Sequence, residues 1–157
     1  MSEVPIRVWR VGRNSDSQYL VVLRDDSGHA LPMTIGPCEA IAIWSVLRSQ
    51  GQGAPVARRP ATHDLVCALV ERLGARLTKV VIDDLWNEVY YAKLHLALNG
   101  ETVAVDSRPS DAIAIALRLG APLYASPSVL DAALEKGEPS APAEDDQPPD
   151  LDLGLDD

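Results

Sequence analysis

Apolar and polar residues alternate over much of the first 35 residues, which is the pattern of β-strands that have one buried face. A cluster of turn residues at 25–28 separates two of the strands. Pro32 lies in the third strand and favours an edge position or a bulge, because proline cannot donate to a central ladder. The predicted strands are the stretch around Ile6, Val8 and Val11, the run 19–23 and the segment 29–35.

Helical spacing replaces this alternation after Gly36-Pro37. Proline suits the first helical turn, where its missing N–H costs nothing, so we expect a helix from Pro37 that ends in the Gly- and Pro-containing segment 50–55. A second helix is predicted from Thr62, as N-cap, to Gly74, with Leu65, Leu69 and Leu73 in register.

A three-strand meander is the next predicted unit, and Asn99-Gly100 in it is the strongest hairpin signal of the chain. The helix that follows is apolar nearly all round, so we expect it to be central and buried, with Gly120 at its end. The grouping of strands indicates an α+β fold with a mainly antiparallel sheet and about four helices. The predicted ranges are strands 76–85, 89–98, 101–105 and 122–125, and helices from 109 or 110 to 119 and from 127 to about 134.

Charge divides the chain of 157 residues into two parts, a domain at 1–134 and an acidic, proline-rich tail at 135–157. The tail has nine acids and one base, so it carries −8 of the formal charge of −9 and leaves −1 on the domain. We expect this tail to be disordered, because self-repulsion and proline prevent a packed core. The overall acidity therefore does not exclude a nucleic-acid partner for the domain.

Several classes of protein lack support in the sequence. No apolar run reaches the roughly 20 residues of a membrane helix, and the first residues have no apolar signal-peptide core, so we expect a cytoplasmic protein without a membrane partner. Cys38 and Cys67 make neither a disulfide framework nor a zinc motif. Phosphate-binding glycine loops, G-x-S-x-G and H-E-x-x-H are absent from the sequence.

Polar residues gather at three predicted helix starts. They are Glu39 at the first helix, Thr62, His63 and Asp64 at the second, and the run from Asp106 to Asp111 at the third. Acids in a first helical turn accept free backbone N–H groups and face the positive end of the helix dipole. Capping alone accounts for Glu39, Asp64 and Asp111, each taken singly.

Arg108 needs a further explanation, because a cation at a helix N-terminus does not complement the dipole. One explanation is structural, a salt bridge to Asp106, Asp111 or Glu39. The other is anion binding, in which the guanidinium, the Ser107 and Ser110 hydroxyls and the free N–H groups of the helix start hold a phosphate. Spacing alone does not separate the two.

If the three helix starts converge, their side chains form a carboxylate–imidazole cluster beside a cation. Such a cluster could bind Mg²⁺ or Mn²⁺ through oxygens and stabilise charge on a phosphodiester. His63 would transfer a proton, since histidine is the side chain that exchanges protons near neutral pH. The candidate metal ligands are Asp106, Asp111, Glu39 and Asp64.

The sequence resembles the bifunctional nuclease domain family over about residues 4–134. The matching blocks are Leu31–Ala40, Arg59–Leu65, Val89–Leu94 and, with the greatest specificity, Asp106–Ala116 (DSRPSDAIAIA). The resemblance implies an α+β domain, often oligomeric, and an activity described for plant members as hydrolysis of RNA and DNA. By position it marks Glu39, Thr62, His63, Asp64, Asp106, Arg108, Ser110 and Asp111.

The chain departs from the family pattern at two places. Residues 33–35 read Met-Thr-Ile where the family commonly has an aromatic residue, and an acidic tail stands in place of the C-terminal module of plant members.

Two hypotheses follow. The first is a metal-assisted nuclease of single-stranded or loosely structured RNA or DNA. It predicts an open, acid-lined pocket into which Arg108 points. In it Asp106, Asp111 and Glu39 hold the metal or activate water, and His63 shuttles a proton. The second is a non-catalytic, homo-oligomeric binding or regulatory domain, in which Arg108 is buried and paired with Asp106 or Asp111.

Overall fold

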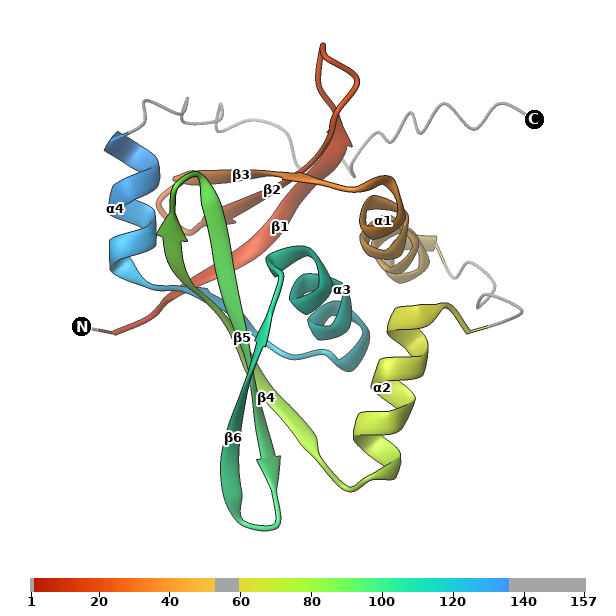
Figure 1. Cartoon of the computed structure of the whole chain (residues 1–157). Coiled ribbons are helices and arrows are strands. Elements are labelled where there is room, and N and C mark those ends of the chain that lie inside the picture. The colour runs from red at the N-terminus through yellow and green to blue at the C-terminus, as the bar shows by residue number, and fades with distance from the viewer. Residues whose placement is uncertain (1, 53–59, 136–157) are drawn as a thin grey trace.

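The computed structural model describes residues 2–52 and 60–135, and it shows an α+β fold with four helices and one seven-stranded sheet (Figure 1). The fold class predicted from the sequence is therefore confirmed. The strands are β1 (Val4–Arg13), β2 (Tyr19–Asp25), β3 (Ala30–Ile35), β4 (Arg76–Trp86), β5 (Val89–Leu98), β6 (Glu101–Ser107) and β7 (Leu123–Ala125), and the helices are α1 (Pro37–Gln52), α2 (Thr62–Arg72), α3 (Pro109–Leu119) and α4 (Pro127–Glu135).

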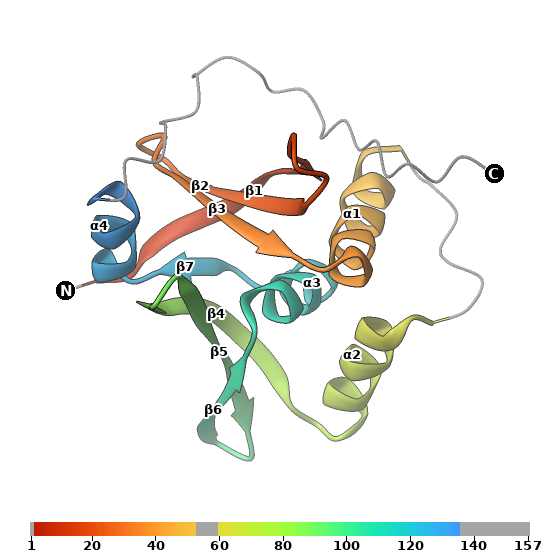
Figure 2. The ribbon, with the colours of Figure 1, turned by 45° about the horizontal axis from the view of Figure 1, so that its top comes forward.

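The sheet consists of two antiparallel meanders joined by one short strand. Its order is β3-β2-β1-β7-β4-β5-β6, so β7 lies between the first and the fourth strand (Figure 2). β7 is antiparallel to β1, with Val4 opposite Ala125, and parallel to β4, with Val80 opposite Leu123. All other pairings are antiparallel. Three residues of β7 thus unite the N-terminal and central parts of the chain in one sheet.

α3 is the central helix, as its apolar sequence predicts. Pro109 occupies its first turn, and Gly120 ends it in a left-handed conformation with φ of 67°, which glycine adopts without strain. The segment from Ala112 to Ala116 is buried, and its alanines let the helix lie close to its neighbours. α3 packs against α1, α2, β4 and β5, while α4 packs against β4, away from the other helices (Figure 1).

Local chemistry also accounts for the position of one proline and of one helix cap. β3, which contains Pro32, is an edge strand as predicted. The prediction that Thr62 caps α2 is wrong by one residue. Ala61 has the extended N-cap backbone, and its N–H is bound by the Asp64 carboxylate at 2.8 Å. An acid at the third helical position satisfies this donor, so the chain needs no hydroxyl at the cap.

The predicted tail, 135–157, lies outside the described residues apart from Glu135, the last residue of α4. Within the described ranges no helix is long and apolar enough to cross a membrane.

Candidate functional site

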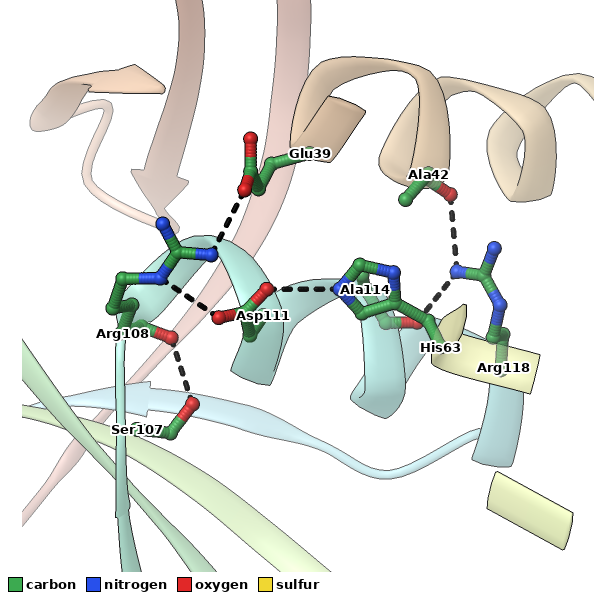
Figure 3. A network of polar contacts seen from close by, with 8 residues as sticks. All are labelled: Glu39, Ala42, His63, Ser107, Arg108, Asp111, Ala114 and Arg118. Carbon is green, nitrogen blue, oxygen red and sulfur yellow. Dashed lines mark hydrogen bonds and ion pairs between the residues drawn. The ribbon is translucent and has the colours of Figure 1, made fainter. Parts of the chain in front are cut away.

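Four side chains from three helix starts form a continuous polar network (Figure 3). Asp111 is at its centre. Its Oδ1 lies 2.9 Å from His63 Nε2, and its Oδ2 accepts a hydrogen bond from Arg108 Nε, also at 2.9 Å. Arg108 Nη2 donates to Glu39 Oε1 at 2.8 Å. The convergence of helix starts that the sequence hypothesis requires therefore exists for Glu39, His63, Arg108 and Asp111.

The secondary structure explains how these residues meet. Glu39, His63 and Asp111 lie in the first turns of α1, α2 and α3, and both α1 and α2 pack on α3. Arg108 is the N-cap residue of α3, with an extended backbone (φ −67°, ψ 143°) that directs the chain from β6 into the helix. The partial positive charge at each helix start favours the carboxylates.

The charges of the network reinforce one another. Burial acts to raise the pKa of Asp111, but hydrogen bonds from Arg108 and His63 outweigh it and hold the pKa below its ordinary value. Bonds from Asp111 and Glu39 raise the pKa of the Arg108 guanidinium further above its usual range. Asp111 is therefore an anion at neutral pH, and it holds the imidazole and the guanidinium on either side.

Glu39 reaches Arg108 because Gly36 leaves space for it. A Cβ atom at position 36 would lie 2.3 Å from Glu39 Oε2, closer than any contact of this kind tolerates. The carboxylate thus lies against the backbone at the junction of β3 and α1. The Gly-Pro-Cys-Glu sequence consequently does more than open a helix, because its glycine also determines where the acid points.

Arg118, which the sequence predictions did not include, ties the three helices together beside this network (Figure 3). Only 9% of its side chain is exposed. Its Nε donates to Asp64 Oδ1 at 2.7 Å, and its Nη1 donates to the carbonyl oxygens of Ala42 (3.0 Å) and Ala114 (2.9 Å). Burial acts to raise the pKa of Asp64, and the bonds from Arg118 and from the Ala61 N–H lower it overall. The sequence contains one sign of this role, because Arg118 is the single cation within the largely apolar helix α3.

The other predicted site residues lie apart from the network. Asp106 is 90% exposed and lies 3.7 Å from Lys93 Nζ, which also binds Asp83. Ser107 donates to the adjacent Arg108 carbonyl oxygen at 2.9 Å, and Ser110 is buried in the first turn of α3. Thr62 is exposed at the start of α2.

The predicted metal ligands do not form a set in the described structure. Asp111 and Glu39 bind Arg108, Asp64 binds Arg118, and Asp106 lies beside Lys93. Among the residues of 2–52 and 60–135, no group of three or more His, Cys, Asp or Glu side chains is arranged to hold a metal ion. The carboxylates in this arrangement fit cations of the chain itself better than a divalent ion.

Arg108 combines features of both functional hypotheses. It is paired with Asp111, as the non-catalytic reading predicts, yet 66% of its side chain is exposed, whereas that reading predicts burial. An exposed guanidinium held by two carboxylates is accessible to a phosphate in solvent.

Comparisons with known proteins agree with the resemblance seen in the sequence. A family model described as Bifunctional nuclease domain matches residues 21–137. An uncharacterized protein of Mycobacterium tuberculosis is 39% identical over 130 residues, which cover 83% of this chain and 74% of the relative. Bifunctional nuclease 1 of Oryza sativa subsp. japonica is 32% identical over 120 residues, covering 74% of this chain and 35% of the plant protein. For Bifunctional nuclease 1 of Arabidopsis thaliana the identity is 30% over 128 residues, 77% of this chain and 38% of the relative.

Proposed function

Because this chain belongs to the bifunctional nuclease domain family, we propose that it hydrolyses phosphodiester bonds of RNA, DNA or both. The observation that supports an active site is the contact of His63 and Arg108 with opposite oxygens of Asp111. In this geometry an imidazole and a guanidinium flank one carboxylate, which supports the proposal that they transfer a proton and bind a phosphate. The matched part is about a third of each plant nuclease, so the activity of those whole proteins reaches this chain only as a proposal.

The roles follow from the atoms that remain free. With Nε2 of His63 bonded to Asp111, Nδ1 is the ring nitrogen left to take a proton from an attacking water. The water oxygen then forms the new bond to phosphorus while the bond from phosphorus to the leaving oxygen breaks. The leaving oxygen takes a proton from solvent, and the His63 imidazolium afterwards returns its proton to solvent. Asp111 fixes the ring orientation and stabilises the imidazolium, while Arg108 offsets the charge that develops on the phosphoryl oxygens. Glu39 positions Arg108.

A divalent metal ion, Mg²⁺ or Mn²⁺, is part of the prediction, and the cleavage assay described below tests it. We place no step on it, because the four carboxylates predicted to bind it are paired with cations or lie apart.

The test is degradation of labelled single-stranded RNA and DNA by the purified full chain, with Mg²⁺, with Mn²⁺ and with chelator. Arg108→Gln and His63→Gln should abolish most cleavage while the proteins stay folded. Asp106→Asn is the matched comparison, because Asp106 is an exposed acid two residues before Arg108 and outside the network. Equal activity of the wild type and the folded Arg108 and His63 variants contradicts the proposed site.

The second candidate is a non-catalytic binding domain, and the double pairing of Arg108 favours it. On this account the network joins three helices and serves stability alone. Absence of cleavage under every metal condition, together with a large loss of stability in Arg108→Gln, supports this candidate.

We also propose that the protein works as a homo-oligomer in the cytoplasm. The support for an oligomer is a row of exposed leucines along α2 and its C-cap, namely Leu65, Leu69 and Leu73, which are 54%, 51% and 75% exposed. Apolar side chains at this spacing form one stripe of a helix, and exposed apolar stripes mark contact sites. Light scattering on the wild type and on Leu69→Glu tests the assembly, and cell fractionation tests the location.

A further inference from the structure

Arginines gather around a tryptophan on the outer face of β1 and β2. Inward-facing Ile6, Val8 and Leu23 belong to the core, so the alternating positions Arg7 and Arg24 face away from α1. The register between β1 and β2 shifts from Val8 to Arg10, so Trp9 lies at the irregularity. Arg10 then lies opposite Val22 on the outer face.

Trp9 holds two of these guanidinium groups. The ring centre lies 4.9 Å from the Cζ atom of Arg10 and 5.3 Å from that of Arg24. A guanidinium stacks on an aromatic ring through its flat face, so the N–H groups along its edge stay available for hydrogen bonds. The stack therefore fixes two arginines while leaving their phosphate-binding edges free.

No acidic side chain among the described residues neutralises these cations. Arg7 and Arg24 are direct cross-strand partners, and like charges in that position repel. None of the ion pairs among the described residues involves Arg7, Arg10 or Arg24. The nearby acid Asp25 is buried and bonded to His29. Three unneutralised cations on one strand pair indicate an anionic ligand.

We propose that this surface, made by Arg7, Trp9, Arg10 and Arg24, binds single-stranded nucleic acid. Arginine edges fit successive phosphates, and the outer planes of the guanidiniums that Trp9 holds offer faces on which unpaired bases stack. A duplex hides those base faces, so the surface favours single strands. The inference rests on the proposed function, for which it supplies a substrate class and a docking surface on the side of the sheet opposite α1.

Binding of a fluorescent oligo(dT) and oligo(U) by the full chain tests the proposal. Asp111→Asn is introduced in every protein so that the probe stays intact. We expect Arg10→Gln/Arg24→Gln to weaken binding at least ten-fold and to reduce the slope of log affinity against log salt by about 1.4, the value for two phosphate contacts on a single strand. Trp9→Leu removes the ring that holds both guanidiniums. It should weaken binding by at least about five-fold, which corresponds to the smallest free energy usually lost with one base stack.

The matched control is Arg48→Gln, because Arg48 also stacks on a tryptophan, Trp44, at 5.0 Å but lies alone on α1. It should bind like the parent protein. Equal binding by the double variant and the parent overturns the proposal. So does polyglutamate that displaces the probe as well as an unlabelled oligonucleotide does, because the surface would then accept any polyanion.

Parallel cleavage assays on chains with Asp111 intact separate the two proposals. Loss of binding in the double variant, without cleavage by the wild type, supports the docking surface and contradicts the nuclease. Cleavage by the wild type, with binding unaffected by the arginine changes, supports the nuclease and contradicts the docking surface.

Discussion

Oδ1 of Asp111 lies 2.9 Å from Nε2 of His63, a residue 48 positions earlier in the chain. The contact joins the first turn of α3 to the first turn of α2. The second carboxylate oxygen of Asp111 accepts from Arg108, so one carboxylate orients both an imidazole and a guanidinium. The same contacts act on stability and on the proposed chemistry, and the predictions below separate these two effects.

Asp111→Asn should lower both cleavage and stability. The amide cannot neutralise Arg108 and accept from His63 at the same time. We expect a loss of about 1–2 kcal/mol in the free energy of unfolding, at the low end for hydrogen bonds to charged groups because Arg108 is largely exposed. Cleavage should fall by at least about 100-fold if His63 and Arg108 act together. Urea unfolding and the labelled-RNA assay measure the two effects, and Asp106→Asn should change neither. A stable variant with full activity contradicts the role given to Asp111.

The network should also make stability depend on pH in the acidic range. Folding lowers the pKa of Asp111, since the bonds from Arg108 and His63 outweigh the effect of burial. Its contribution is thus fully present above the ordinary aspartate value of 3.8 and is lost as the pH falls through the lower, folded value. The free energy of unfolding should therefore decline below about pH 4, and less steeply in Asp111→Asn.

Urea unfolding at a series of pH values measures this difference. Asp25 and Asp64 also have lowered pKa values, because their hydrogen bonds outweigh the effect of burial, so part of the acid sensitivity should remain in the variant. Superimposable pH profiles of the wild type and Asp111→Asn would show that the Asp111 carboxylate does not contribute.

Gly36→Ala should disturb the site while leaving the fold intact. The new Cβ would lie 2.3 Å from Glu39 Oε2, which is the end of a flexible side chain, so the carboxylate moves away rather than the backbone. We expect Arg108 to lose its bond to Glu39 and cleavage to fall. Gly12→Ala in β1 is the matched control, since its Cβ would have no atom within 4 Å. Activity assays and thermal unfolding of both variants test this, and equal activity contradicts the positioning role of Glu39.

Most of the fold could be predicted from the sequence because its local signals agree. The Asn99-Gly100 turn, the N-terminal Pro109 of α3 and the terminal Gly120 each fix a boundary through backbone geometry alone. The place of β7 between β1 and β4 could not be predicted, because three residues have no periodicity and their partners are distant in the chain.

The site could be predicted only in part, for a similar reason. Their places at predicted helix starts led to Glu39, His63 and Asp111, and their convergence depends on how α1 and α2 pack on α3. Asp106 and Arg108 are two residues apart, yet the first faces Lys93 and the second faces Asp111, because β6 ends between them. The Arg–Trp surface was missed, since its members come from two strands and meet only through their register.

Arg118→Lys should destabilise the protein although it keeps the charge. The guanidinium of Arg118 serves Asp64, the Ala42 carbonyl oxygen and the Ala114 carbonyl oxygen at once, and an ammonium group lacks the fork that reaches all three. Asp64 is partly exposed and the Ala42 carbonyl oxygen also accepts from Ser45, so we expect a loss of about 1–2 kcal/mol, from charged hydrogen bonds that lysine cannot reproduce.

The expected loss is measured by urea unfolding, with Arg72→Lys as the control, because Arg72 is exposed on α2 and none of the described ion pairs includes it. The effect should be on stability rather than on the chemistry, since Arg118 contacts neither His63 nor Arg108 in the described network. Cleavage per folded molecule should therefore be nearly unchanged well below the melting temperature. If the Arg118→Lys protein is folded and stable but has lost cleavage, Arg118 belongs to the active site together with the four residues of the Asp111 network.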